Sequence, residues 1–163
     1  MRTPRLLALP AALVGLIVAL AAGAPALSGC DSGGSAACPT DVAFGFEDVT
    51  PDSVEVGSVV VGQGDCVSVA YVGRLADGGG VFARGTDFRF VVPSTNILPT
   101  GFVLGMGNQR EGETRIVTVP PNLGFGPFER GALFEGGVDI PACSVVEFEI
   151  TLNRIFQDAR SCS

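Results

Sequence analysis

Apolar and polar side chains alternate one for one near the end of the chain, in SVVEFEITLNRI from Ser144 to Ile155. Successive side chains of a β-strand point to opposite faces, so this alternation predicts a strand with one buried and one solvated face. Further strand patterns lie at Val67 to Leu75, Asp87 to Val92 and Thr114 to Val119, with one or two more around Phe44 to Val49 and Val56 to Val61. Because glycine-rich turns separate these segments, we expect an antiparallel sheet of about five strands.

One segment is expected to be helical, PTGFVLGM from Pro99 to Met106. Proline suits the first turn of a helix, and Phe102 and Met106 lie four apart on one face. Two interior glycines lower the helix propensity, so this helix depends on the sheet for its stability. A single short helix against one sheet predicts an α+β fold. The twenty residues after Pro121 show no period, and a loop of that length in a small domain is usually functional or mobile.

The first thirty residues have the pattern of an export signal. Two arginines precede an uncharged run from Leu6 to Ala26, and LSGC follows, from Leu27 to Cys30. LSGC resembles the lipobox of bacterial lipoproteins, which implies cleavage before Cys30 and acylation of that cysteine. An ordinary secretory signal cut near Ala24, or an uncleaved anchor, remains open as an alternative. Each of these places the rest of the chain outside the cytoplasm.

The rest of the chain suits one domain, since 163 residues with 47% apolar content form a single core of ordinary size. We therefore expect a signal peptide over 1–29, a flexible tether over 30–41 rich in small residues, and the domain over 42–163. The expected location is the bacterial cell envelope, on the periplasmic side, with a membrane anchor at Cys30. A monomer is expected.

Charge and residue usage exclude several function classes. The formal net charge is −7 and becomes about −9 without residues 1–29, with no basic patch, so nucleic acid is not an expected partner. The chain has no histidine and no lysine, which excludes Ser-His and Cys-His nucleophilic sites and Schiff-base chemistry. Carboxylate pairs such as Glu147 with Glu149 fit a solvated strand face. No cofactor is expected, and the chemistry that remains needs only a shaped apolar pocket.

Four cysteines follow Cys30, at Cys38, Cys66, Cys143 and Cys162. An even number in an oxidising compartment favours two disulfides, with three possible pairings. Zinc is the weaker interpretation, because the gaps are wide and no C-x-x-C pair exists, so no metal site is expected.

Four stretches of the chain, in order and spacing, resemble the domain of FKBP-type peptidyl-prolyl isomerases. They are VSVAYVGRLADGGGVF, FRFVV, GFVLGMGNQREGETRIVTVPPNLGFG and IPACSVVEFEITL, within about Val56 to Ile155. The most specific part runs from Gly101 to Gly126, where a glycine-aromatic pair, an REGE turn, a strand and PPxxG-aromatic-G follow one another. The resemblance implies an FKBP-like twisted antiparallel sheet wrapped around one short α-helix, with a proline pocket between them.

The resemblance also implies a function, the cis-trans isomerisation of X-Pro bonds in exported proteins, with proline-containing polypeptides as clients. The family pocket positions fall on Tyr71, Phe82, Phe102, Phe125, Ile140 and Phe148, with Phe102 as the floor. Substrate-contacting positions fall on Phe88, Leu98 and Ala83.

Three features of this region differ from the family pattern. The family usually has aspartate at the position of Ala83, and often tyrosine at Phe125. The spacing around Pro99 leaves two alignments open. Without a gap, Pro99 occupies the place of a ligand-binding backbone N–H and has none to offer; if Thr100 is an insertion, Leu98 takes that place. The alternative function is therefore a catalytically weak or inactive FKBP-like domain that acts as a peptide-binding or chaperone module. The family topology also predicts a disulfide pairing, Cys38 with Cys143 and Cys66 with Cys162.

Overall fold

A computed structural model describes residues 37–38, 41–51, 55–94, 96–156 and 158–162. The predicted signal peptide over 1–29, the lipidation site Cys30 and most of the predicted tether over 30–41 lie outside these residues. Within the described ranges, no helix is long and apolar enough to cross a membrane.

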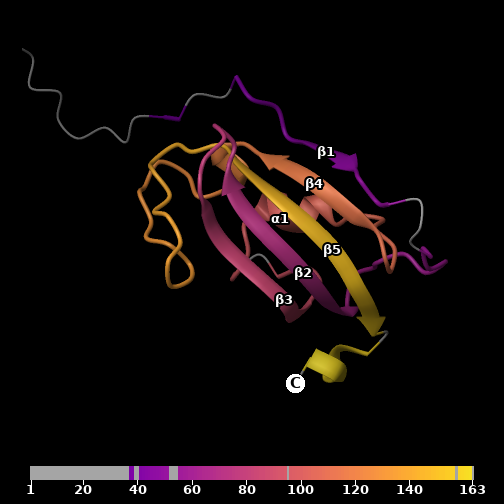
Figure 1. The fold of residues 1–163 in the computed structure, drawn as a ribbon. Coiled ribbons are helices and arrows are strands. Elements are labelled where there is room, and N and C mark those ends of the chain that lie inside the picture. The colour runs from indigo at the N-terminus through magenta and orange to yellow at the C-terminus, as the bar shows by residue number, and fades with distance from the viewer. Residues whose placement is uncertain (1–36, 39–40, 52–54, 95, 157, 163) are drawn as a thin grey trace, which may run out of the picture. The chain divides into compact units, whose positions relative to one another are not determined.

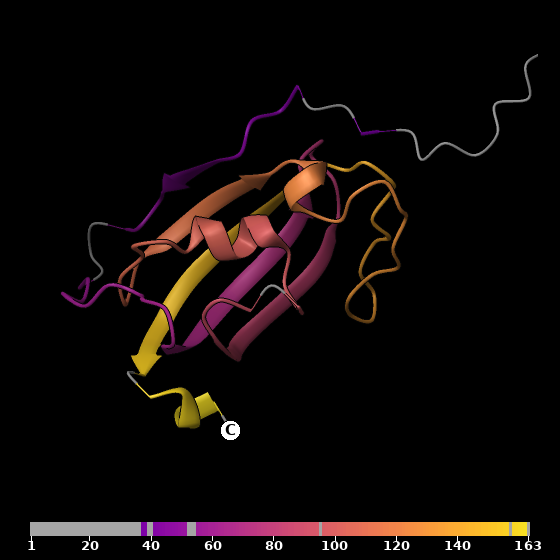
Figure 2. The same ribbon diagram turned by 180° about the vertical axis from the view of Figure 1, so that it is seen from behind.

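The core of the fold is one antiparallel sheet of five strands with a short helix on one face (Figures 1 and 2). The strands are β1 (Gly45–Asp48), β2 (Cys66–Leu75), β3 (Val81–Val91), β4 (Thr114–Val119) and β5 (Val146–Phe156), and the helix is α1 (Thr100–Gly105). Their order in the sheet is β1-β4-β5-β2-β3, and every neighbouring pair is antiparallel. The predicted α+β fold is confirmed.

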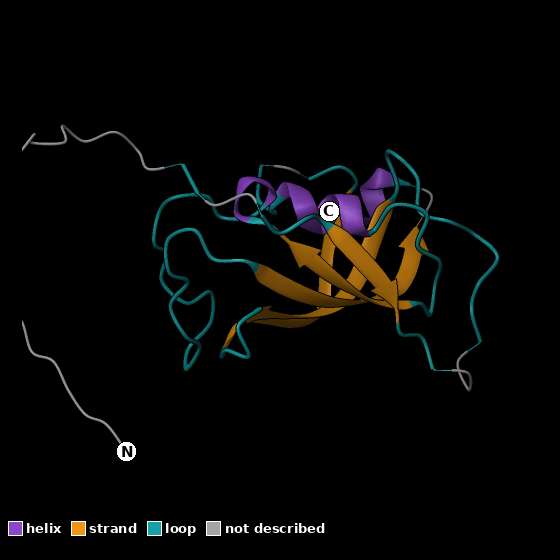
Figure 3. Cartoon of the chain, turned by 90° about the horizontal axis from the view of Figure 1, so that it is seen from above, coloured by secondary structure: helices purple, strands orange, loops and turns teal. Residues whose placement is uncertain are grey.

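The central strand β5 carries the alternation read from the sequence. Val146, Phe148, Ile150 and Leu152 are all buried, while Glu147 and the other residues between them are partly exposed. These side chains belong to one core cluster with Phe102 and Met106 of the helical segment. Figure 3 shows the helix over one face of the sheet. The strand begins two residues later than predicted, and β4 has the predicted bounds.

Two strand predictions need correction. β3 begins at Val81, six residues before the predicted start at Asp87, because it forms a long hairpin with β2 whose register shifts twice and breaks the alternation. The segment Val56–Val61 is not a strand. It forms a single bridge, from Val60 to Arg110, because its neighbour is a turn rather than a strand.

Helix α1 lies against β4 through two glycines. Pro99 is the N-cap and Met106 the C-cap, so the predicted helix Pro99 to Met106 is confirmed to within its caps. A Cβ atom on Gly105 would lie 2.5 Å from a methyl carbon of Val117, and one on Gly101 would overlap Val119 in the same way. The glycines that weaken the isolated helix therefore let its backbone approach the sheet.

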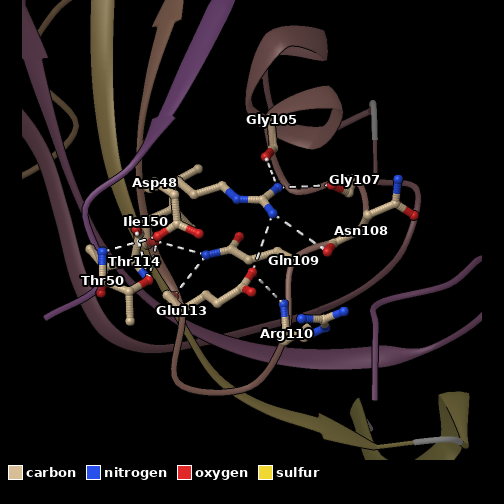
Figure 4. Close-up of polar contacts among 11 residues, drawn as sticks. Asp48, Thr50, Gly105, Gly107, Asn108, Gln109, Arg110, Glu113, Thr114 and Ile150 are labelled. Atoms are coloured by element: carbon tan, nitrogen blue, oxygen red, sulfur yellow. Dashed lines mark hydrogen bonds and ion pairs between the residues drawn. The ribbon is translucent and has the colours of Figure 1, made fainter. Parts of the chain in front are cut away.

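A buried polar network fixes the end of α1 (Figure 4). The Arg115 guanidinium donates to the carbonyl oxygens of Gly105 at 3.3 Å and Gly107 at 2.8 Å, and pairs with the Glu113 carboxylate at 3.2 Å. Fully buried Gln109 donates from Nε2 to the carbonyl oxygen of Ile150 at 3.0 Å. Since helix ends leave carbonyl groups without intrahelical partners, β4 supplies the donors that the C-terminus of α1 lacks.

Both disulfides have the pairing predicted from the family topology. Cys38 bonds to Cys143, and Cys66 at the start of β2 bonds to Cys162 in the final turn of 3₁₀-helix, η2 (Ala159–Cys162). Each closes about a hundred residues of chain, with separations of 105 and 96. Cross-links of that span restrict the unfolded chain strongly.

The long aperiodic segment is anchored to the edge of the sheet. After a short 3₁₀-helix, η1 (Pro121–Leu123), the chain runs beside β3, and the N–H groups of Leu133 and Val138 donate to the carbonyl oxygens of Phe82 and Val81 at 2.8 and 3.0 Å. The Arg84 guanidinium lies 4.4 Å from the centre of the Phe134 ring. Part of the edge of β3 is thereby covered by this loop.

We predict that Gly105→Ala lowers the free energy of unfolding by about 1–3 kcal/mol, because the added methyl group overlaps Val117. Helix propensity alone predicts the opposite sign, a gain of about 1 kcal/mol, so the two effects are distinguishable. Urea unfolding without reductant, followed by circular dichroism, measures the difference. Gly45→Ala is the control, since nothing lies within 4 Å of its added carbon. A more stable Gly105→Ala variant would contradict the close contact.

Candidate functional site

An open cavity of about 420 Å³ lies between the start of α1, the sheet and the long loop. That size is in the range of small-ligand pockets. The residues that line it are Tyr71, Ala83, Phe88, Ile97, Leu98, Pro99, Phe102, Phe125, Arg130, Leu133 and Phe148. Five different parts of the chain contribute, and most of the lining is aromatic or aliphatic.

The Phe102 side chain occupies the centre of the aromatic cluster and is fully buried. Its ring centre lies 5.1 Å from that of Phe148 and 5.7 Å from that of Tyr71, with the planes nearly perpendicular. Such edge-to-face contacts add to the stability that burial alone provides. Because Gly101 presses the first turn of α1 onto β4, the next residue, Phe102, is held against β2 and β5.

Phe82 and Ile140 lie behind this lining. Both are fully buried and neither lines the cavity. The Phe82 ring packs edge-on against the rings of Phe125 at 5.5 Å and Phe148 at 5.6 Å. A Cβ atom on Gly73 would lie within 3 Å of both Phe82 and Phe148, so this glycine leaves the room that the two rings fill. These residues support the wall of the pocket.

The three predicted substrate-contacting positions, Phe88, Leu98 and Ala83, all line the cavity. The N–H group of Leu98 donates to the carbonyl oxygen of Ser94 at 3.1 Å. A bound peptide would have to displace that bond to use this amide. Ala83 is buried and brings only a methyl group to the pocket.

Four lining residues were not among the predicted site residues: Ile97, Pro99, Arg130 and Leu133. Ile97 is 67% exposed and Leu133 is 57% exposed, so both form a rim rather than a wall. They lie in segments without periodicity, where no sequence pattern marks a pocket residue. Only the position of Pro99 beside Leu98 pointed to the site in advance.

The phenol hydroxyl of Tyr71 is the polar group within the aromatic cluster. Burial raises the pKa of its phenol above the ordinary value of 10.0. Among the described residues its hydroxyl has no hydrogen-bond partner, so it is available to a bound molecule. The side chain also makes an edge-on contact with Phe88, with ring centres 5.8 Å apart.

Comparison with known families decides what this arrangement belongs to. The family profile described as FKBP-type peptidyl-prolyl cis-trans isomerase matches residues 57–153, which include every residue that lines the pocket. The chain belongs to this family. The match begins after β1 and ends within β5, so it covers β2, β3, α1, β4 and most of β5.

Individual relatives agree with the family assignment. The chain is 37% identical over 93 residues to FK506-binding protein 2 of Candida glabrata, covering 55% of this chain and 63% of the relative. It is 32% identical over 115 residues to FK506-binding protein 2 of Kluyveromyces lactis, covering 68% of this chain and 76% of the relative. The chain thus spans somewhat less than two thirds of the Candida protein.

Two solved structures share the fold. The structure of the three FKBP domains of wheat FKBP73 superimposes with a TM-score of 0.59 at 24% identity, over 74% of this chain and 49% of that one. A peptidyl-prolyl cis-trans isomerase from Pseudomonas syringae gives a TM-score of 0.53 at 23% identity, over 70% and 76%. At this level of identity the likeness supports the fold alone.

Tyr71 offers a direct probe of the site, because it is the only tyrosine and the chain has no tryptophan. We predict that phenolate absorbance titrates with a pKa above 10, since burial disfavours the charged form. The raised pKa of the Tyr71 phenol contributes to the free energy of unfolding. This contribution is complete below about pH 10 and is lost as the pH rises through the pKa of the folded state. A ligand that fills the pocket raises the value further.

The titration has a simple control. Tyr71→Phe removes the signal, and denaturant returns the pKa of the natural chain to about 10. A folded-state pKa at or below that value would mean that the phenol is open to water and does not lie in the pocket as described.

Proposed function

We propose that this chain is a peptidyl-prolyl cis-trans isomerase that acts on X-Pro bonds of exported proteins. The observation that carries the proposal is the apolar pocket built on fully buried Phe102 inside the region that matches the family profile. The matching family and the Pseudomonas syringae protein are both named for this activity.

The reaction is rotation about an amide bond, whose resonance sets a barrier of about 18–20 kcal/mol. The twisted amide has less charge separation than the planar one, so an apolar pocket binds it better and lowers the barrier. Phe102, Tyr71 and Phe148 exclude water from the proline ring in this proposal, and Phe82 and Ile140 hold the wall behind them. No residue has to gain or lose a proton.

The pocket lacks hydrogen-bonding groups for the substrate at three positions, so we expect a moderate rate of X-Pro isomerisation. Ala83 brings no carboxylate, Phe125 brings no hydroxyl, and the Leu98 amide is engaged with Ser94. Each missing hydrogen bond weakens transition-state binding by about 0.5–1.5 kcal/mol. Proline-containing polypeptides are the proposed clients, and the domain is proposed to act as a monomer.

A second candidate function rests on the exposed rim. Ile97, Leu133 and Phe128 of the rim and loop are each more than half exposed, and such side chains bind extended apolar peptides. A domain that holds unfolded chains without turning over X-Pro bonds would use the same pocket. Protection of a client whose refolding does not depend on proline isomerisation favours this second function.

The decisive experiment is a prolyl isomerisation assay on the chain from Asp31 onward. We expect catalysis above background, and about a fivefold increase in kcat/KM in Ala83→Asp, since one restored hydrogen bond contributes about 1 kcal/mol. Phe125→Tyr is expected to act in the same direction. Phe102→Leu, which keeps an apolar side chain, is expected to reduce the rate while the fold remains intact by circular dichroism.

The same assay can reject the proposal. A rate at background in the natural chain and in Ala83→Asp, with both proteins folded, would exclude the isomerase. Phe102→Ala is a harsher variant, because truncating a buried phenylalanine costs about 3–5 kcal/mol of stability, so its loss of activity counts only with a folding control.

We also propose that the protein is exported in a bacterium and anchored through a lipid on Cys30. The LSGC sequence and the two disulfides support this, since disulfides persist outside the cytoplasm. Metabolic labelling with a tagged fatty acid is expected to mark the natural chain and not Cys30→Ala. Labelling of both would exclude Cys30 as the lipid site.

A further inference from the structure

Arg130 stands at the mouth of the proline pocket. Its backbone forms a two-way bridge with Ile140, with N–H to carbonyl distances of 2.9 and 2.7 Å, so the loop position is fixed from the backbone. Its guanidinium lies 5.6 Å from the centre of the Phe125 ring, and the residue is exposed. The backbone bridge leaves the side chain free to meet a ligand.

A second, smaller hollow adjoins the proline pocket. It measures about 210 Å³ and shares five lining residues with the larger cavity: Ile97, Leu98, Pro99, Phe125 and Arg130. Asn96, Thr100 and Gly124 complete its lining, so it is more polar than the proline pocket. A peptide whose proline occupied the larger cavity would place a neighbouring side chain over this hollow.

The charges around the two cavities are uneven. Arg130 is the one charged residue among the described residues that line either of them. Glu129, Glu135 and Asp139 belong to the same loop and line neither cavity. Arg130 forms no ion pair with any residue in the described part of the chain, whereas Arg74, Arg89, Arg115 and Arg160 each have an acidic partner.

We propose that Arg130 is a specificity-determining residue that makes this pocket prefer prolines with a carboxylate side chain next to them. The inference rests on the proposed function, because it assigns the class of segment that the same pocket takes. A guanidinium pairs well with a carboxylate, and the smaller hollow provides room for an acidic side chain. The whole chain carries a net charge of −7, so the attraction is local to this mouth rather than a property of the surface.

A purely structural role for Arg130 makes a different prediction. If its guanidinium only supports the Phe125 ring, replacing it would change the binding of acidic and neutral peptides equally. If it selects a carboxylate, the change is confined to the acidic peptides and Arg130→Lys, which keeps the charge, retains much of the preference. The two roles are therefore separable by a peptide pair that differs only in charge.

The test uses the full chain, purified in detergent, with peptides of matched shape. One pair has Glu or Gln immediately before the proline, and a second pair has Glu or Gln immediately after it. Both kcat/KM by exchange spectroscopy and Kd by calorimetry are measured. The expected preference for Glu over Gln is about two- to fivefold in at least one pair, the size of an exposed ion pair, and it shrinks as salt is added.

The variants decide the assignment. Arg130→Gln is expected to remove the preference, which is measured as the ratio of Glu to Gln peptide within each pair, so a change that affects both peptides equally does not count. Arg110→Gln is the matched control, because Arg110 is exposed and lines neither cavity, and it is expected to leave the preference intact.

Failure of this inference is distinct from failure of the proposed function. Equal Kd values for Glu and Gln peptides in both pairs, or a preference that survives in Arg130→Gln, would overturn the role of Arg130 whether or not the chain turns over X-Pro bonds. A third outcome is that the chain does not turn over X-Pro bonds but still binds Glu peptides more tightly than Gln peptides, and that Arg130→Gln removes this preference. That outcome would support the role of Arg130 in a binding module and would reject the isomerase.

Discussion

The contact between α1 and β4 determines where the pocket forms. Gly101 and Gly105 have no side chain, so the helix backbone rests directly on Val119 and Val117. Arg115 lies two residues before Val117 on the same face of β4, and its guanidinium donates to the carbonyl oxygens at the end of the helix. One face of β4 therefore sets both the distance between the helix and the sheet and the position of the helix C-terminus.

The aromatic cluster follows from that contact. Phe102 comes directly after Gly101 and is fully buried against Tyr71 and Phe148, from two neighbouring strands. Any side chain at Gly101 or Gly105 would lift the helix and separate Phe102 from these rings. In this fold the residues that bind and the residues that position them are adjacent in the chain, so the site is sensitive to changes that never touch a ligand.

The regular elements could be predicted because each has one buried and one solvated face. β4 and β5 show this alternation plainly, and their bounds were predicted to within two residues. β3 was predicted too short, because two register shifts in its pairing with β2 interrupt the pattern. Val56, Val59 and Val60 look like part of a strand in sequence, yet all three are exposed, and Val60 pairs only with Arg110 in a turn, which no local pattern reveals. The pocket residues on strands and helix could be predicted from motifs, whereas Ile97, Arg130 and Leu133 depend on loop paths fixed by backbone hydrogen bonds, and these leave no mark in the sequence.

The Cys38–Cys143 disulfide changes how the domain would bear load. Cys143 donates its N–H to the carbonyl oxygen of Gly126, the residue after Phe125 at the pocket wall. In the proposed lipoprotein, seven residues would separate the anchored Cys30 from Cys38, and the eight steps between them span at most about 29 Å. A force that pulls on the chain before Cys38 would act on the domain through Cys143, beside the pocket, rather than through β1, which follows Cys38. Under the proposed anchoring at Cys30, the cross-link would keep this force off the edge strand β1 and would hold the domain close to the lipid.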